Sequence, residues 1–268
     1  MSDNLTSAEQ WIEKFRTLMA QTQYAEALQA LDNSIRIDPN YALAWALKGL
    51  ALNYLDKYND AIPVLNHAIS LNPNSADLWE AKGLALKSLK MFDDAIACLN
   101  TALKINPQSA LTWKYLGESF LGSNEDGPAL ECLKQAVAID PNDSQCWLYC
   151  GMIQERNERV ADALQSYDNA IKTDPDSSLV WEFKGILLEN AHQHEDAIPY
   201  LDQAIKLNPS GERSWKYKGM ALAYLSHFDE SISCLERSLS IYSDDEELHD
   251  FLRKVKILKN NNGRVPKE

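Results

Sequence analysis

The sequence predicts an all-α protein built as an α-solenoid, in which one helical hairpin is repeated along the chain. All seven tryptophans fall on a period of 34 residues, beginning at Trp11 and ending at Trp215. Six glycines and six prolines keep the same step, beginning at Gly49 and Pro39. Three residue types on one period identify an internal repeat, and a repeat of this length corresponds to one supersecondary unit that stacks on its neighbours.

The first helix of each repeat carries the tryptophan and the glycine. In the second repeat, Trp45, Gly49 and Leu52 stand at i, i+4 and i+7, which is one face of an α-helix. A glycine inside a helix costs about 1 kcal/mol relative to alanine, so its recurrence indicates the close approach of another helix. Lys48 lies at the edge of this face, where its stem can cover apolar surface while its ammonium reaches water.

The second helix follows a short polar turn, "DKYND" at 56–60. Ala61, Leu65 and Ala68 repeat the same spacing, and the two alanines are the small residues expected to face the glycine. The helix ends before Pro73, because a proline disfavours helical geometry in the residue that precedes it. Each repeat is therefore expected to be a hairpin of two helices.

The whole chain divides into seven such repeats, a closing helix and two ends that we expect to be flexible, 1–7 and 261–268. A helix over 246–260 is acidic at its start and basic at its end, which suits the helix dipole and a capping role. The seven repeats span 8–41, 42–75, 76–109, 110–143, 144–177, 178–211 and 212–245.

Composition limits the partners and the compartment. The net charge is −13 and the pI about 4.9, and an acidic chain repels phosphate backbones, so we expect no nucleic-acid partner. No run of apolar residues is long enough for a membrane span, and "MSDNLTSAEQ" lacks the pattern of a secretory signal. Five cysteines, an odd number, suit free thiols in a reducing compartment. We therefore expect a cytoplasmic protein with no membrane contact.

The sequence offers little chemistry for catalysis. Cys146 and Cys150 lie at i and i+4 of one helix, which is not a CxxC arrangement, so packing is the favoured role. His192 and His194 stand beside two carboxylates in "HQHED", but a solvated turn is favoured over a metal site because no further ligand is near in sequence. We expect no enzymatic activity, cofactor or metal, and a hidden catalytic or metal-binding role of the cysteines or histidines is the alternative.

The repeat pattern, W-x₃-G followed by Ala, an aliphatic or aromatic residue, Ala and Pro, resembles the tetratricopeptide repeat (TPR) family over about 8–245. The W-x-x-K-G form looks like repeats common in prokaryotic, particularly archaeal, proteins. The resemblance implies a right-handed superhelix whose concave face is lined mainly by the first helix of each repeat. It also implies a non-enzymatic scaffold that binds a protein or peptide, as a monomer or weak homo-oligomer.

A second apolar stripe follows positions two, six, nine and thirteen of the first helices, and family geometry directs these positions into the groove. We expect part of the stripe to pack between repeats. We expect the stripe of the fourth to seventh repeats, with Tyr149, Phe183 and Tyr217 in a row, to form an aromatic surface that binds an amphipathic segment of a partner. An accessory subunit held in a larger complex through its convex face or ends is the alternative interpretation. The candidate groove residues are Leu50, Tyr54, Tyr115, Tyr149, Met152, Phe183, Ile186, Arg213, Lys216, Tyr217, Met220 and Tyr224.

One ligand class can be excluded by a testable prediction. Some TPR domains grip acidic C-termini of chaperones with a clamp whose first repeat carries Lys at position five and Asn at position nine. Position nine here holds residues such as Arg16, Leu50 and Glu118, and no repeat has Asn there. We predict that calorimetry detects no binding of a short acidic C-terminal peptide. Low-micromolar binding that disappears when the terminal carboxylate is amidated would contradict this prediction.

Overall fold

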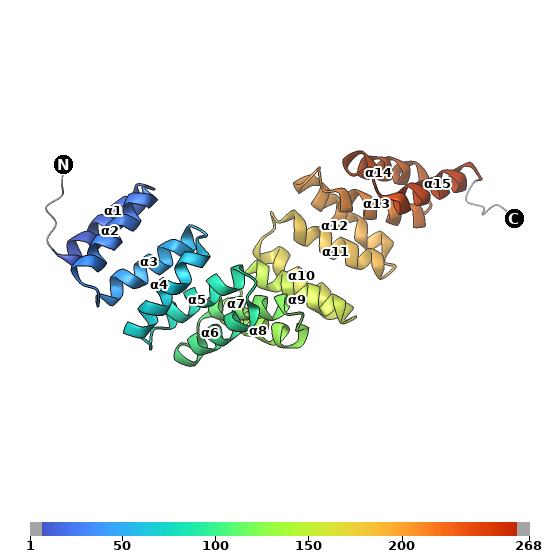
Figure 1. Cartoon of the computed structure of the whole chain (residues 1–268). Coiled ribbons are helices and arrows are strands. Elements are labelled where there is room, and N and C mark those ends of the chain that lie inside the picture. Colours follow the sequence, from blue (N-terminus) through green and yellow to red (C-terminus); the bar gives the residue numbers. More distant parts are fainter. Residues whose placement is uncertain (1–6, 262–268) are drawn as a thin grey trace. The chain divides into compact units, whose positions relative to one another are not determined.

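The computed structural model describes residues 7–261, and in that range the chain folds into fifteen α-helices with no strand (Figure 1). Residues 1–6 and 262–268, which make up most of the ends predicted to be flexible, lie outside the described residues. The chain forms two compact units, Met1–Asp140 and Pro141–Glu268, called here the N-terminal and the C-terminal unit. The all-α repeat architecture expected from the 34-residue period is confirmed.

The N-terminal unit holds four hairpins. The second helix of one hairpin packs on the first helix of the next, and the first helices α3, α5 and α7 also contact one another in that order. These three first helices therefore share one side of the unit. Its helices are α1 (Ala8–Ala20), α2 (Tyr24–Ile37), α3 (Ala42–Tyr54), α4 (Tyr58–Leu71), α5 (Ala76–Ser88), α6 (Phe92–Ile105), α7 (Ala110–Gly122) and α8 (Asp126–Ile139).

The C-terminal unit holds three hairpins and a closing helix. The same stacking recurs, with the second helix of each hairpin against the next element of the chain, and α15 packs against α14. Helix α15 spans the range expected for the capping helix. The helices of this unit are α9 (Ser144–Arg156), α10 (Val160–Thr173), α11 (Ser178–Asn190), α12 (His194–Leu207), α13 (Glu212–Tyr224), α14 (Phe228–Ile241) and α15 (Glu246–Asn260).

The repeated glycine is a packing residue, as its position predicts. A Cβ built on Gly83 would lie 2.6 Å from the side chain of Leu99, which is fully buried on the partner helix of the same hairpin. The same relation joins Gly49 to Leu65. The residue that faces the glycine is thus the leucine between the two alanines, and not the alanines themselves. The missing Cβ lets the two helices of a hairpin close around that leucine.

The tryptophan and the proline share one period because they are hydrogen-bonded. The indole N–H of Trp45 donates to the carbonyl oxygen of Pro39 at 2.9 Å, and Trp79 donates to Pro73 at the same distance. All six tryptophans from Trp45 onward make this bond across six residues of sequence. Each ring is half-buried and ties the entry of a first helix to the loop before it.

The repeated lysine does not end in water, which corrects the sequence-based expectation. Its stem is partly covered, and in three of the four W-x-x-K-G repeats its ammonium pairs with an aspartate sixteen residues earlier, on the second helix of the preceding hairpin. In the third repeat that position is Asn66, and the ammonium of Lys82 lies 5.7 Å from the centroid of the Trp79 ring. The Lys48–Asp32 and Lys218–Asp202 distances are both 2.5 Å. Lys184 makes the same pair with Asp168. The lysine therefore links successive hairpins.

The hairpin turns are tighter than the sequence indicates. The turn after α3 occupies 55–57, and Tyr58 already begins α4, so the predicted turn at 56–60 extends too far. Asp56 has a φ of 56°, and the N–H of Lys57 donates to the carbonyl of Leu52 at 2.9 Å. This is a Schellman closure with a residue other than glycine in the left-handed region. A residue other than glycine has a positive φ at the equivalent position of every hairpin: Thr22, Asp56, Lys90, Asn124, Glu158, His192 and Ser226.

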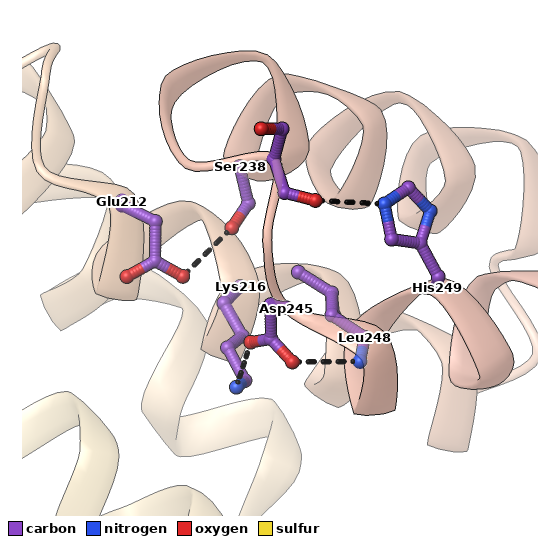
Figure 2. Close-up of polar contacts among 7 residues, drawn as sticks. Glu212, Lys216, Ser238, Asp245, Leu248 and His249 are labelled. Atoms are coloured by element: carbon purple, nitrogen blue, oxygen red, sulfur yellow. Dashed lines mark hydrogen bonds and ion pairs between the residues drawn. The ribbon is translucent and has the colours of Figure 1, made fainter.

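One aspartate both caps the closing helix and bonds to the last hairpin. Figure 2 shows Asp245 between two donors: Lys216 of α13 contacts one carboxylate oxygen at 2.6 Å, and the N–H of Leu248 contacts the other at 2.9 Å. Lys216 and the Leu248 N–H together hold the pKa of Asp245 below its usual value. Nearby, Ser238 of α14 donates to Glu212 at 3.1 Å. Asp245 thus caps α15 and joins it to the last hairpin.

We predict that Asp245→Ala lowers stability by about 1 kcal/mol at pH 7, the usual cost of losing an N-cap. Because the pKa of Asp245 is lower in the folded state, its contribution is present above the unfolded value of 3.8 and is lost as the pH falls through the folded value. The difference between variant and wild type should therefore shrink below pH 4. Urea unfolding followed by circular dichroism at both pH values measures it.

Asp250→Ala is the matched control, because Asp250 lies on the same helix and its ion pair with Arg253 is exposed. It removes the same charge without removing a cap. An Asp245→Ala variant as stable as Asp250→Ala at pH 7 would contradict the capping role.

We predict opposite effects for two glycine-to-alanine changes in the N-terminal unit. Gly83→Ala places a methyl group against the buried Leu99, and overpacking of about 1–3 kcal/mol outweighs the helix propensity gained. Gly127→Ala, in the first turn of α8, meets no atom within 4 Å and should stabilise by up to about 1 kcal/mol. Urea unfolding compares the two. Equal stabilisation by both changes would show that the helices need no glycine to pack.

Candidate functional site

The N-terminal unit carries a groove of about 420 Å³ on its first helices, α3, α5 and α7. Its apolar lining comes from stripe positions of three successive repeats, with Leu50 on α3, Leu84 on α5 and Leu111 on α7. Leu50 is 41% exposed and Leu111 is 46% exposed. Aliphatic side chains left this open, and gathered in one concavity, form a surface that a partner can cover.

Two tyrosines complete the apolar part of the groove. Tyr54 is 67% exposed, and its ring centroid lies 5.8 Å from that of Tyr24. Tyr115 is half-buried, and the ammonium of Lys87 lies over its ring at 4.6 Å from the centroid. Lys87 also pairs with Glu118, so its charge is already balanced. The structure therefore brings together the predicted residues Leu50, Tyr54 and Tyr115.

Hydrogen-bond acceptors occupy the polar part of the groove. Glu80 accepts from the hydroxyls of Ser109, at 3.1 Å, and Thr112. Asp77, near the start of α5, is exposed. Asn53 is 7% exposed; its Nδ2 donates to the carbonyl of Ala81 at 2.6 Å, and its buried Oδ1 has no hydrogen-bond partner. The lining residues carry two carboxylates and one amide oxygen but no cation.

In the C-terminal unit, several predicted groove residues are engaged in packing. Phe183 lies between the ring of Tyr167, with centroids 6.1 Å apart, and the guanidinium of Arg213, 5.3 Å from its centroid. Arg213 also pairs with Glu182 at 3.3 Å. Phe183 and Met152 pack against the same buried cluster. These side chains join neighbouring hairpins and are half-covered before any partner binds.

Ile186 is the clearest correction among the predicted residues. It is 3% exposed and belongs to the core of α11 and α12, so its side chain is not available to a ligand. Tyr217 packs against that cluster, and Met220 packs against the core between α14 and α15. Position nine of a first helix lies at the edge of the core, so packing of the next hairpin decides whether it is covered.

The remaining predicted residues of this unit are separate from one another. Lys216 forms an ion pair with Asp245, as described above. Tyr149 keeps its hydroxyl at the surface, where it accepts from Gln145 Nε2 at 3.0 Å. Tyr224 is 57% exposed, and its ring stacks on that of His194 with centroids 4.5 Å apart. Of the aromatic residues predicted for the groove in this unit, Phe183 and Tyr217 are therefore partly covered.

His194 does not lie in a solvated turn, which corrects the sequence-based interpretation. It begins α12, and its buried Nδ1 lies 3.7 Å from the carboxylate of Glu189. Burial lowers the pKa of His194 and raises the pKa of Glu189. Both groups therefore tend toward their neutral forms. In residues 7–261, no cluster of three or more His, Cys, Asp or Glu side chains is placed to hold a metal ion.

The cysteines are buried throughout. All five are buried and none forms a disulfide, as the packing interpretation expects. Burial raises the pKa of Cys132 to about 11 and also raises the pKa values of Cys98 and Cys234. A thiol that stays protonated is a poor nucleophile.

Among the described helices, none combines the length and apolar character needed to cross a membrane.

Sequence reasoning missed the polar residues of the groove. Asn53 stands in the apolar run "GLALNYL", and Glu80 follows Trp79 directly. A polar residue that interrupts an apolar helix face is the only signal that pointed to Asn53. Glu80 has no such signal, because position five also holds lysine in other repeats, such as Lys114 and Lys216.

Comparison with known proteins agrees with this architecture. A tetratricopeptide repeat model matches residues 116–178 and 184–246, and a model of the N-terminal TPR repeats region of Psidin matches residues 15–121. No curated protein matches the chain.

Solved structures give the same fold at low identity. A TPR protein from Parabacteroides merdae is 13% identical with a TM-score of 0.65, over 93% of this chain and 98% of that one. PilF of Pseudomonas aeruginosa is 17% identical with a TM-score of 0.68, over 80% and 97%. YrrB, described as a TPR protein with an unusual peptide-binding site, is 19% identical with a TM-score of 0.61, over 70% and 96%.

The two family models together cover well over half of the chain, and every hairpin carries the repeat that they describe. The chain belongs to the tetratricopeptide repeat family.

Proposed function

We propose that this protein is a non-enzymatic interaction scaffold that binds a segment of a partner protein in the groove of its N-terminal unit. The observation that carries the proposal is the gathering of Leu50, Leu84 and Leu111 in one concavity on three successive first helices. Exposed leucines cost free energy when they are left in water, and burying them against a partner recovers about 25 cal/mol for each Å² covered.

The groove has the make-up of a peptide site. Its apolar side chains supply contact area, and its few polar atoms, on Asn53, Asp77 and Glu80, can fix the orientation of a bound segment. YrrB, a structural neighbour of this chain, is described as having a peptide-binding site. A protein partner suits both observations.

The C-terminal unit is a candidate for a second, smaller contact. Tyr149 and Tyr224 keep exposed aromatic surface on first helices, and Phe183, Tyr217 and Met220, on first helices of the same unit, are half-buried. Aromatic side chains are enriched at the centres of interfaces. The proposal places the principal binding energy in the N-terminal groove, because the aromatic residues of the C-terminal unit already pack against their own core.

A partner held through second helices or through the ends of the chain is the competing function. Exposed apolar residues on second helices, such as Ile37 and Ile105, would then carry the contact. Groove variants would leave such a complex intact, which makes the two functions distinguishable.

We predict that the double variant Leu50→Gln/Leu111→Gln keeps its helical circular-dichroism spectrum but binds the native partner more than tenfold less tightly. A tenfold loss corresponds to about 1.4 kcal/mol, a modest cost for two apolar contacts. The partner is first identified by co-purification from the native organism. Its affinity for each purified variant is then measured by calorimetry.

Ile37→Gln/Ile105→Gln is the matched control, because both isoleucines are exposed to a similar extent but lie at the ends of second helices, α2 and α6. The control should bind as wild type does. If the control loses the partner while the groove variant keeps it, the contact lies on the second helices and the proposed groove function fails.

A further inference from the structure

We infer that the N-terminal groove selects a basic and apolar segment, in which lysine or arginine side chains flank leucine-like or aromatic anchors. This inference rests on the proposed function and adds the chemistry of the ligand. It follows from the charges and the unsatisfied acceptor of the groove.

The charge of the groove is one-sided. Asp77 and Glu80 are its only ionised lining residues, and the bonds to Glu80 come from the neutral hydroxyls of Ser109 and Thr112. Lys87, beside the groove, is paired with Glu118. Two carboxylates without a cation in the lining attract a ligand ammonium or guanidinium and repel an acidic ligand.

Asn53 adds an acceptor that the protein itself does not satisfy. Its Nδ2 is held by the carbonyl of Ala81, so the side-chain amide cannot turn over, and Oδ1 must act as the acceptor. That oxygen is buried and has no donor. An unsatisfied buried acceptor is costly, and a ligand N–H that reaches it removes the cost. Because this oxygen is closed to solvent, a ligand N–H reaches it only when the side chains that cover it move, and the carboxylates of Asp77 and Glu80 are the acceptors that line the groove itself.

The aromatic rings suit the same ligand. The ammonium of Lys87 already lies over the ring of Tyr115, so the exposed ring of Tyr54 is the aromatic face left for a ligand cation. The ring of Tyr54 is exposed beside Leu50. A side chain with an apolar stem and a charged end can cover the leucines with its stem while its end meets the carboxylates.

The test begins with a phage-displayed library of random dodecapeptides, selected on the full chain. Peptides that bind wild type but not Leu50→Gln/Leu111→Gln are groove ligands. We expect these to be enriched in lysine and arginine next to leucine or aromatic residues, and depleted in aspartate and glutamate. One enriched peptide is then synthesised with a fluorophore, together with an analogue in which norleucine replaces each lysine or arginine.

Fluorescence anisotropy compares both peptides on Asp77→Asn/Glu80→Gln. Glutamine at position 80 keeps an acceptor for Ser109 and Thr112, so only the charge is removed. We expect the basic peptide to lose at least tenfold in affinity, while the norleucine analogue changes less than twofold. Asp60→Asn/Asp93→Asn, in the first turns of α4 and α6, removes the same charge outside the groove and should leave both affinities unchanged.

Asn53→Leu separates a ligand contact from a structural role. It removes the unsatisfied oxygen along with the bond to Ala81, so we expect the urea midpoint of the free protein to be retained while the basic peptide loses at least fivefold in affinity. A variant that loses stability but binds the peptide as tightly as wild type would assign Asn53 a structural role and remove it from the inference.

The outcomes distinguish a failure of the basic specificity from a failure of the groove function. Groove ligands without a basic excess, or a basic peptide that binds Asp77→Asn/Glu80→Gln as tightly as wild type, would overturn the basic specificity and leave the groove function standing. A selection that yields no groove-dependent peptide would count against both.

Discussion

The close approach of two helices at a glycine is the contact on which the rest of the structure depends. In each hairpin from the second onward, the glycine leaves space for one large side chain of the partner helix, which is leucine in five hairpins and Tyr167 opposite Gly151. Tyr167 is fully buried and donates its hydroxyl to Glu155 at 2.7 Å. Because this contact fixes the spacing within a hairpin, it also fixes which residues of the first helix are left to face outward.

Contacts between hairpins are of a different kind. The lysine–aspartate pairs, such as Lys48–Asp32, and the bonds from tryptophan to the proline carbonyl lie around the edge of the apolar core. Apolar packing alone does not fix the relative position of two successive hairpins, and these directional polar bonds do. In the N-terminal unit this arrangement brings α3, α5 and α7 together, and the groove lies on those three helices.

Much of the fold could be predicted from the sequence, because a 34-residue period in rare residues requires one hairpin for each repeat. The range of α15 and the packing role of the glycines follow from patterns that are local to one helix or one hairpin. The partner of the repeated lysine could not be found in the same way, because Asp32 and Lys48 belong to different repeats. The Schellman turns were missed because the left-handed position holds Asp56 or Lys90 where glycine would be the usual signal.

The site was only partly predictable for a similar reason. Leu50, Tyr54 and Tyr115 follow from the stripe on the first helices, but Ile186 occupies an equivalent position and is covered by its neighbours. Burial of a residue at the edge of the core depends on the size of side chains in the neighbouring repeat. A pattern within one helix carries no information about those side chains. The unsatisfied Oδ1 of Asn53 is a property of the packed structure alone.

The central claim is that a partner segment lies against the first helices of the N-terminal unit. Methyl NMR of leucine- and methionine-labelled protein, titrated with the binding segment of the native partner, tests it most directly. The account predicts that the methyl signals of Leu50, Leu84 and Leu111 shift with the titration, while those of Met152 and Met220 change little. Shifts confined to the methionines of the C-terminal unit, with the three leucines unmoved, would contradict it.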